Sequence, residues 1–420
     1  MTSDLTKKRV VSPLAQRRDE VAARMQRLLM EHVINKTTDR GDHPLRNLAT
    51  SYTDPARFEA EKRKLFRKLP VLAGLTRDVP NPGDKMLFED AGPPILIVRA
   101  KDSVIRAYLN MCPHRAAKVV EVCRPGSRMT CPFHSWTFDL DGKLIGMPGS
   151  VSFDGLAQAE LGLVKVPVVE WHGLIFVVAD PDAGPIDIAS YLGSFAPELE
   201  MLDLAGAMPI KTTRVEARTN WKYAVDTYGE SYHLTSLHPD TVGKAAVNDT
   251  MVYEQFAQHH RICYAPIGMV GDAKKPRDEW PKRPFSAAAY LLFPNTVIHV
   301  TAQGPGHTFF VYRIFPGQSV TESFTMLTTY RSADVADDED IAPWVGMHDY
   351  QAQVIGTEDY RAASAAQTNL EYAPAGHSLV YGSNEISIQN FEQYINNLVG
   401  DTDTDVDGAS TAAGLTTADS

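Results

Sequence analysis

Hydrophobic and polar residues recur along this chain with different periods, and the change of period divides it into parts. Between Ser12 and Asn35 apolar residues recur every three or four positions, as on one face of a helix, and charged residues occupy the opposite face. The pattern predicts an amphipathic helix near the N-terminus. Its apolar positions are Val21, Met25, Leu28, Leu29 and Val33.

From about residue 68 to residue 182 the pattern changes to short β-rich runs separated by turn signals such as Pro-Gly and Asp-Gly. These runs include PPILIVRA, SVIRAYLN and GLIFVVAD. Helical and strand patterns then mix up to Gly400, with strand pairs such as TFFVYRIFP and ESFTMLTTYRS. We therefore expect a helical segment (1–67), a β-rich region (68–183), a mixed region (184–400) and a disordered acidic tail (401–420).

The composition is that of an ordinary globular protein, with 44% hydrophobic and 22% charged residues among 420. A formal net charge of −11, with no dense Lys/Arg face, argues against a nucleic-acid partner. The start, MTSDLTKKRVV, lacks a signal-peptide core, and the longest apolar stretch, residues 173–179, is too short to span a membrane. Four cysteines do not make a disulfide framework, so we expect metal ligands or core thiols in a reducing cytoplasm.

Two Cys/His pairs stand close together in the β-rich region. Cys112-x-His114 is followed, after sixteen residues, by Cys131-x-x-His134. Two thiolates and two imidazoles can bind zinc tetrahedrally. They can also hold a [2Fe–2S] cluster in which two histidines replace two cysteines on one iron. The spacing therefore indicates a metal site and leaves zinc and iron–sulfur open.

The residues around the pairs favour the cluster. A proline follows each ligand cysteine and stiffens its turn, and residues 136–145 alternate like two strands joined at Asp141-Gly142. Ligand loops at the tips of hairpins leave the histidine edge of a cluster open to an electron donor. Cys123, between the pairs, is expected to be a small apolar filler, and Arg115 either tunes the cluster or joins a surface ion pair.

A second group of chemistry-bearing residues lies between residues 219 and 242. Helical spacing places Asp226, Glu230 and His233 at i, i+4 and i+7, a polar stripe on a predicted helix. His238 is five residues further, about 140° around a helix, so the helix must end or bend for both rings to converge. Two such histidines and one carboxylate form a face that binds Fe(II) and leaves positions open for O2.

The missing carboxylate is expected in the helical stretch 354–370, where Glu358 and Asp359 are adjacent among small and apolar residues. Taken alone, such a pair is typical of a solvated acidic surface. Beside two histidine ligands supplied from elsewhere in the chain, either carboxylate would complete an iron site.

In combination these motifs resemble those of the Rieske non-haem iron oxygenases, the α subunits of aromatic ring-hydroxylating oxygenases. C-x-H-x16-C-x-x-H precedes N-W-K-x(7)-E-x-x-H-x4-H-P and then E-D-x(7)-Q, and the match covers about residues 68 to 400. The resemblance implies an α+β fold with an N-terminal helical segment and an all-β Rieske [2Fe–2S] domain at 68–183. It further implies a catalytic domain at 184–400 of the helix-grip (START/Bet v 1-like) type, with an antiparallel sheet.

The resemblance also implies ligands at both metal sites. Glu358 remains the alternative to Asp359 as the third iron ligand, and Gln367 matches a family glutamine that is more often structural than ligating. The implied cluster ligands are Cys112, His114, Cys131 and His134. The implied ligands of the mononuclear Fe(II) are His233, His238 and Asp359.

Glu230 is expected to be a catalytic residue that does not bind metal. In the family the carboxylate three residues before the first iron histidine is usually Asp, and it links that histidine to a Rieske histidine of the neighbouring subunit. Glu is widespread at this position among monooxygenases and demethylases, so it weakens the case for cis-dihydroxylation. Asp226, one turn earlier, either joins this path or caps the local network.

The implied activity is that of a terminal oxygenase component. A reductase using NADH or NADPH, with a flavin or a ferredoxin, would supply electrons for O2 activation and for dihydroxylation or monohydroxylation of an aromatic or other hydrophobic substrate. An O- or N-demethylating monooxygenase is the alternative. A non-catalytic Rieske electron-transfer or ligand-binding protein and a zinc-organised module are remote ones. Family members form head-to-tail homotrimers, some with a separate β subunit.

The substrate pocket is expected to be apolar and to lie between the iron histidines and Asp359. Arg261 or His260, if turned inward, would indicate a carboxylate-bearing substrate, but both are expected on the surface. Histidines without ligand spacing, His299 among them, receive no predicted role. The candidate lining residues are Val252, Phe256, Ile262, Tyr264, Tyr290, Leu292, Phe293 and Ile298.

Overall fold

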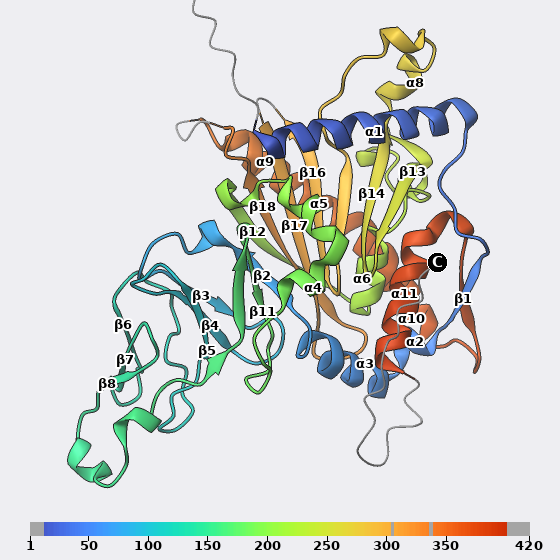
Figure 1. Ribbon diagram of the computed structural model, residues 1–420. Coiled ribbons are helices and arrows are strands. Elements are labelled where there is room, and N and C mark those ends of the chain that lie inside the picture. The colour runs from blue at the N-terminus through green and yellow to red at the C-terminus, as the bar shows by residue number, and fades with distance from the viewer. Residues whose placement is uncertain (1–11, 304–305, 336–338, 401–420) are drawn as a thin grey trace, which may run out of the picture.

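The computed structural model describes residues 12–303, 306–335 and 339–400, so the acidic tail that the sequence predicts to be disordered lies outside the described residues. Figure 1 shows a small β-rich part at the lower left and a large sheet surrounded by helices. None of the helices in the described ranges is long and apolar enough to cross a membrane.

The long helix α1 (Pro13–Asn35) forms where the N-terminal period predicts it. The hydroxyl of Ser12 caps it by accepting a hydrogen bond from the N–H three residues on, at 3.1 Å. Met25 and Leu29 are buried, whereas Leu28 is 36% exposed. Consecutive helical side chains point about 100° apart, which turns Leu28 off the buried stripe.

The β-rich region consists of three small sheets with strand orders β3-β4-β5-β9, β6-β7-β8 and β10-β11-β2. The predicted turn at Asp141-Gly142 joins β7 to β8. Gly142 has φ +79°, and a Cβ there would lie 2.5 Å from the Tyr108 ring, so only glycine fits. The strands are β2 (Val71–Leu75), β3 (Lys85–Phe88), β4 (Ile95–Arg99), β5 (Ile105–Leu109), β6 (Arg128–Thr130), β7 (Thr137–Asp139), β8 (Leu144–Gly146), β9 (Lys165–Val166), β10 (Val168–Trp171) and β11 (Leu174–Val177).

The mixed region is organised by one seven-stranded sheet, order β12-β18-β17-β16-β15-β14-β13, whose neighbours all run antiparallel. Its strands are β12 (Met208–Ala217), β13 (Ala246–Phe256), β14 (His259–Pro266), β15 (Ala288–Leu292), β16 (Thr296–Gln303), β17 (Gly306–Pro316) and β18 (Ser323–Arg331). The two strands predicted as a pair from the sequence, β17 and β18, are adjacent in this sheet.

Short helices and one further strand pair surround the sheet. β1 (Leu45–Leu48) pairs with β19 (Ser378–Tyr381), so the N-terminal segment is tied to the C-terminal part of the chain. The helices are α2 (Thr50–Thr53), α3 (Pro55–Glu61), α4 (Ile188–Leu192), α5 (Ala196–Glu200), α6 (Trp221–Asp226), α7 (Leu234–Leu237), α8 (Gly268–Asp272), α9 (Ala342–Val354), α10 (Tyr360–Leu370) and α11 (Ile386–Val399).

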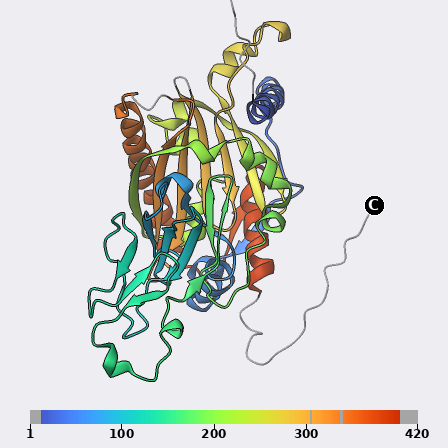
Figure 2. The same ribbon diagram turned by 60° about the vertical axis from the view of Figure 1, so that its left-hand side comes forward.

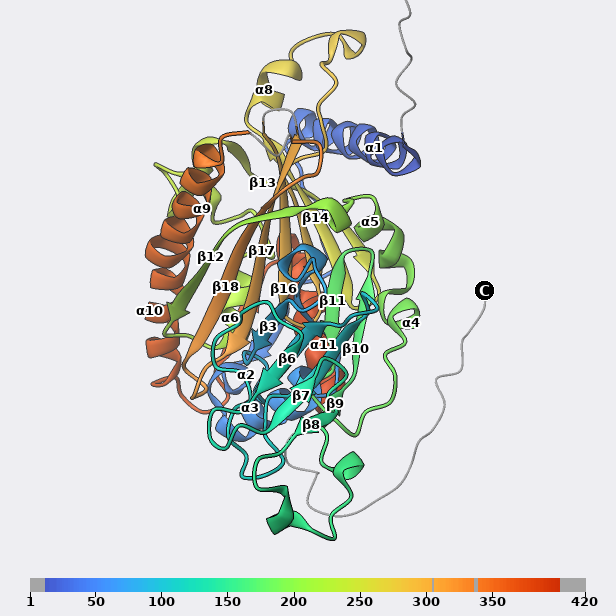
Figure 3. The ribbon, with the colours of Figure 1, turned by 90° about the vertical axis from the view of Figure 1, so that its left-hand side faces the viewer.

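Both faces of the large sheet are buried. Successive side chains of a strand point to opposite sides, so each strand contributes residues to two cores. On one face Tyr290 and Ile298 pack in a core with α1. On the other face Val297 and Phe310 pack in a core with Tyr360 of α10. Figures 2 and 3 show α1 and α9 on opposite sides of the sheet. The N-terminal helix, the all-β region and this antiparallel sheet confirm the predicted α+β class.

The prediction that one helix carries Asp226, Glu230 and His233 is wrong. α6 ends at Asp226 and α7 begins only at Leu234, so Glu230 and His233 lie in a non-helical connection. The cause is local. The Glu230 carboxylate accepts hydrogen bonds from the N–H groups of Tyr232 and His233, which a continuous helix would donate to backbone carbonyls.

Candidate metal centres

The two Cys/His loops have the same backbone geometry. In each loop the cysteine carbonyl accepts a hydrogen bond from the N–H four residues on, at 2.9 Å from Ala116 and 3.0 Å from Ser135. The cysteine N–H donates to the carbonyl five residues on, at 2.8 Å in both loops. Ala116 and Ser135 also share a left-handed φ, 61° and 59°. The backbone therefore sets the direction of the Cys112 and Cys131 side chains.

The two cysteine side chains lie together, and so do the two histidine side chains. The Cys112 and Cys131 side chains contact each other and are each 2% exposed. The ring centroids of His114 and His134 lie 4.6 Å apart. Burial, and then the neighbouring thiol, raise the pKa of Cys112, so a cationic centre is needed to keep both thiolates there. A [2Fe–2S] cluster with both cysteines on one iron and both histidines on the other fits this arrangement.

A structural zinc ion fits less well. Ligand atoms on a tetrahedral zinc lie about 3.5 Å apart. Among the described residues, no three of Cys112, His114, Cys131 and His134 bring one ligand atom each within 4.8 Å of one another. Three residues elsewhere in the chain do so. The two pairs are thus too widely spread for one ion.

The imidazole edge of this site is the accessible one. His134 is exposed and His114 is half-buried, whereas both cysteines are buried. The His114 ring stacks on Trp136, with centroids 5.0 Å apart and an interplanar angle of 8°, which fixes the ring's orientation. An electron donor would therefore approach the histidine side.

The structure contradicts one expectation around this site and one of the two alternatives for Arg115. Cys123 is exposed because the loop 121–127 runs over the surface, so it is not an apolar filler. Arg115 makes no ion pair with any described residue. Its guanidinium instead lies over the Phe133 ring, 4.9 Å from the centroid.

The structure brings His233, His238 and Asp359 together, with one ligand atom from each inside a 4.8 Å group. Oδ1 of Asp359 lies 3.6 Å from Nε2 of His233 and 3.3 Å from Nε2 of His238. Two neutral nitrogens and one anionic oxygen on one side of an ion form the face that non-haem Fe(II) uses. The donor set and its geometry fit a mononuclear iron.

Each of these histidines also contacts a carboxylate through Nδ1, the ring nitrogen that does not face Asp359. Nδ1 of His233 contacts Oε1 of Glu230. Nδ1 of His238 lies 2.5 Å from Oε2 of Glu358, which also accepts a hydrogen bond from the Thr241 hydroxyl at 2.7 Å. These contacts leave both Nε2 atoms facing Asp359. Glu358 orients a histidine, and Asp359 is the acid of the pair that faces both rings.

The negative charges of the carboxylates at this site favour binding of a cation. Burial lowers the pKa of His233 and of His238, but the hydrogen bonds and charges of Glu230, Asp359 and Glu358 outweigh it and raise both. Burial alone would raise the pKa of Glu358, but the hydrogen bonds that it accepts lower it overall. Three carboxylates around two imidazoles attract protons or, in their place, a metal ion.

A π-helical turn, Ile355–Asp359, joins α9 to α10 and presents the two adjacent acids. Such turns widen a helix and are frequent at functional sites. Further along α10, Gln367 accepts a hydrogen bond from the N–H of Asn220 at 2.9 Å and donates to the carbonyl of Tyr52 at 3.1 Å. This glutamine ties α10 to α6 and α2, a structural role.

Asp226 lies in a separate buried network. The Tyr52 hydroxyl lies 2.7 Å from Oδ2 of Asp226 and 2.9 Å from Oε1 of Glu392, and it also contacts the Tyr381 hydroxyl. Burial, and then the charge of Glu392, raise the pKa of Asp226 well above its ordinary range. Asp226 shares a cavity of about 210 Å³ with Glu230 but makes no hydrogen bond to it within the described part of the chain.

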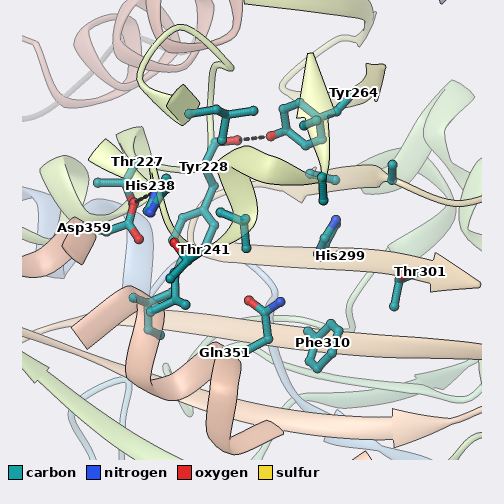
Figure 4. Close-up of a pocket in the computed structure, with 18 of the residues that line it drawn as sticks. Thr227, Tyr228, His238, Thr241, Tyr264, His299, Thr301, Phe310, Gln351 and Asp359 are labelled. Atoms are coloured by element: carbon teal, nitrogen blue, oxygen red, sulfur yellow. Dashed lines mark hydrogen bonds and ion pairs between the residues drawn. The ribbon is translucent and has the colours of Figure 1, made fainter. Parts of the chain in front are cut away.

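The triad opens onto a cavity of about 570 Å³ on the Phe310 face of the sheet. Figure 4 shows His238 and Asp359 at one end and His299, Thr301 and Phe310 at the other. The Tyr264 hydroxyl donates to the Tyr228 carbonyl at 2.9 Å and braces one wall (Figure 4). Most of the lining is apolar or aromatic.

Of the eight side chains predicted to line this cavity, only Tyr264 does. For Tyr290, Leu292 and Ile298 the reason is strand parity, whereas Ile262 and Phe293 belong to the core on the cavity face without lining the cavity. Tyr290, Leu292 and Ile298 point to the α1 face, while their neighbours Ala289 and Val297 face the cavity. A correct strand assignment does not say which face the helices with the iron ligands will cover.

The expected surface position of Arg261 and His260 is also wrong. Arg261 is fully buried, and its guanidinium contacts Glu198 and Glu254 on the α1 side of the sheet. His260 is buried beside Ser387, 3.3 Å from its hydroxyl. Neither lines the cavity, so neither provides a partner for a substrate carboxylate.

Sequence reasoning missed two kinds of residue. Glu358 was considered only as a ligand, although its position next to Asp359 was a signal that two acids could serve two roles. His299 and Gln351 line the cavity without any motif. The cue for His299 was its place two residues after Val297 on a strand, but choosing the face required the tertiary structure.

Comparisons with known proteins match two parts of the chain to family models. Residues 70–167 match the model of the Rieske [2Fe–2S] domain, and residues 204–401 match that of the ring-hydroxylating α subunit catalytic domain. A stretch of 197 residues is 33% identical to the carnitine monooxygenase oxygenase subunit of Escherichia coli (strain K12), covering 46% of this chain and 51% of that protein.

The glycine betaine monooxygenase oxygenase subunit of Pseudomonas aeruginosa is 26% identical over 238 residues, 56% of this chain and 54% of that protein. The chain thus matches about half the length of these curated relatives. The crystal structure of a quaternary ammonium Rieske monooxygenase with L-carnitine superposes with a TM-score of 0.71 at 21% identity. It covers 84% of this chain and 95% of that one, which shows a shared fold.

Proposed function

The chain belongs to the Rieske non-haem iron oxygenases as an α subunit, and on that premise we propose that it is the terminal component of a monooxygenase for an N-methylated substrate. The observation that carries the proposal is the His233, His238 and Asp359 face at one end of the 570 Å³ cavity. Iron bound there would supply reductive activation of O2. Residues of the chain supply and orient the iron ligands, and others line the cavity that would exclude water and position the substrate.

The names of the relatives support nitrogen-bearing substrates over aromatic rings. The relatives named for carnitine and glycine betaine act on quaternary ammonium compounds. The family resemblance adds that glutamate at position 230 is widespread among monooxygenases and demethylases. The proposed reaction inserts one oxygen atom into a C–H bond next to nitrogen. The other oxygen leaves as water with two electrons and two protons, and the hydroxylated product breaks into an amine and an aldehyde.

Hydroxylation of an aromatic substrate is the second candidate. It is favoured by the rings that line the cavity, Tyr264, Phe310 and Tyr312 among them. These rings suit a flat apolar substrate, but they suit a methylated ammonium group equally, because the faces of aromatic rings attract cations. Lining alone therefore leaves both substrates possible, and the relatives favour the amine.

We further propose that electrons reach the iron from the cluster of a neighbouring subunit. In Figure 1 the hairpins β6 to β8 lie at the opposite end of the chain from α10. Glu230 is buried and contacts Nδ1 of His233, which is half-buried, so a histidine such as His134 of another copy would approach this pair at its remaining exposed edge. A homotrimer, a ferredoxin or flavin reductase partner, a separate β subunit and a cytoplasmic location stay predictions.

The experiment is substrate-dependent NADH oxidation by the purified chain with an added reductase. The panel contains quaternary ammonium compounds, tertiary amines, aryl methyl ethers, aromatic acids and polycyclic hydrocarbons. We expect amine and aldehyde products in equal amounts from an N-methylated compound. A cis-dihydrodiol from an aromatic hydrocarbon, with no N-dealkylation of any amine, would contradict the proposal and favour the second candidate.

A further inference from the structure

The cavity has a polar end remote from the metal ligands. His299 of β16 stands there between two aromatic rings, with its centroid 6.5 Å from that of Tyr264 and 6.2 Å from that of Phe310. Neither ring nitrogen has a hydrogen-bond partner among the described residues. The ring is half-buried and lines the cavity.

His299 is therefore a neutral imidazole with unused hydrogen-bonding capacity. Burial lowers its pKa to about 4, so the ring carries no charge near neutral pH. A neutral imidazole offers one N–H donor and one nitrogen acceptor. Because no described residue pairs with either nitrogen and the ring lines the cavity, its donor and its acceptor are both available to a bound molecule.

Gln351 of α9 supplies a second polar group on the same cavity. Its Oε1 accepts a hydrogen bond from the Tyr312 hydroxyl at 3.1 Å, which fixes the direction of the amide. Its NH2 group has no partner in the described part of the chain. Figure 4 shows the ends of the Gln351 and His299 side chains projecting into the space between α9 and β14.

The cavity lacks a group that could pair with an anion. No described lysine or arginine lines it. At the metal end Glu230, Glu358 and Asp359 surround the site, and three carboxylates exceed the charge of one divalent ion by one. A substrate carboxylate in this cavity would lose its hydration without gaining a cationic partner.

We propose that His299 and Gln351 bind an uncharged polar group of the substrate, such as a carboxamide, an ester or a hydroxyl, and that the cavity excludes a carboxylate at that end. The inference rests on the proposed function, because it takes the cavity to be the substrate site. It names the substrate class more narrowly: unlike carnitine and glycine betaine, the substrate carries no carboxylate.

The test compares matched probes that differ in one charge. γ-Butyrobetaine and its carboxamide share a trimethylammonium group and a chain length, and only the first carries a carboxylate. Binding to the metal-loaded protein is measured by calorimetry without O2 and reductase, so that no turnover occurs. We expect the carboxamide to bind at least about tenfold more tightly than γ-butyrobetaine, as one lost polar contact is worth about that factor.

Variants on the cavity face of β16 test whether His299 causes the preference for the carboxamide. His299→Leu should abolish the preference by weakening the carboxamide alone, and His299→Gln, which keeps a donor and an acceptor, should retain it. Val297→Ala is the matched control, because Val297 lines the same cavity from β16. It should weaken both probes equally.

A second probe pair, 4-methoxybenzamide and 4-methoxybenzoate, separates this inference from the proposed function. If only this pair binds, with the amide preferred, charge selection stands and the ammonium substrate falls. If a carboxamide binds as expected but no N-methylated compound is turned over, the proposed function alone fails. Equal or tighter binding of the carboxylates, an unchanged preference in His299→Leu, or failure of both carboxamides to bind would overturn the inference.

Discussion

At the cluster site the backbone positions the ligands, since the Cys112 and Cys131 loops repeat the same pair of hydrogen bonds. At the iron site side chains do so, because His233 is held by Glu230 and His238 by Glu358, 120 residues away in the chain. The first site presents its histidines to solvent, and the second is enclosed by carboxylates. A site fixed by backbone should tolerate loss of a nearby charge, and a site fixed by carboxylates should not.

The largest expected effect is that of Asp359→Ala. Removing the carboxylate that, among the described residues, alone faces both Nε2 atoms should release the mononuclear iron and abolish turnover, while the loops of the cluster stay intact. Iron should fall from about three to about two atoms per chain, with an unchanged visible spectrum. Loss of the spectrum together with the iron would show that the two sites are not independent.

His114→Cys should change the cluster without removing it. A thiolate in place of an imidazole adds negative charge, so the reduction potential should fall by about 100 mV or more while a [2Fe–2S] spectrum remains. Potentiometric titration followed by absorption measures this. An unchanged potential and spectrum would contradict the ligand assignment, and Arg115→Ala, which leaves the ligands in place, is the control.

Glu230→Gln tests coupling between the two sites. The amide keeps the size but loses the charge that orients His233, so both metals should stay bound and the cluster should still accept an electron. Reoxidation of the reduced cluster in a single turnover with substrate and O2 should slow by about 10- to 100-fold. Reoxidation at the wild-type rate would place the bridge elsewhere, and loss of iron would make Glu230 a ligand.

Glu358→Gln should give a smaller effect at the same site. An amide can still accept the hydrogen bond from His238 but no longer balances its charge, so iron affinity should fall by about tenfold without loss of stoichiometry at saturating iron. Competition with a chelator measures this affinity. Complete loss of iron in this variant, with iron retained in Asp359→Ala, would reverse the roles of the two acids.

Asp226→Asn should have the smallest effect, and on stability alone. The Tyr52 hydroxyl has one proton for two buried carboxylates, so the folded protein holds an extra proton at Asp226 or Glu392. A raised folded pKa means that stability falls as pH rises above the unfolded value of about 4. Asn removes this loss, and thermal unfolding should show a gain of about 1 kcal/mol at neutral pH and none at pH 4. A pH-independent loss would contradict it.

Features that depend on contacts local in the sequence could be predicted, and features that depend on distant contacts could not. Cys112 to His134 is a local motif whose turns and hairpin can be predicted from prolines and glycines, and the structure reproduces the hairpin. The helix predicted to run from Asp226 through His233 does not form, because the Glu230 side chain accepts hydrogen bonds from backbone N–H groups. Helical period carries no information about that competition.

The cavity was the least predictable part. Val297 and Ile298 have equal apolar character, and only the placement of α9 and α10 on one face decides which of them meets the substrate. The second role of Glu358 was hidden for a similar reason, since adjacent acids diverge only where the π-helical turn presents them to different atoms of His238.

Metal content and visible spectrum of the purified protein show most directly whether one chain carries two different iron centres. We expect about three iron atoms and two acid-labile sulfides per chain, a red-brown colour, and a reduced [2Fe–2S] signal. In Asp359→Ala one of the three irons should be lost and the sulfide should stay unchanged. Zinc in place of iron and sulfide at the Cys112 and Cys131 loops, or a wild-type chain with only two irons after reconstitution, would contradict this expectation.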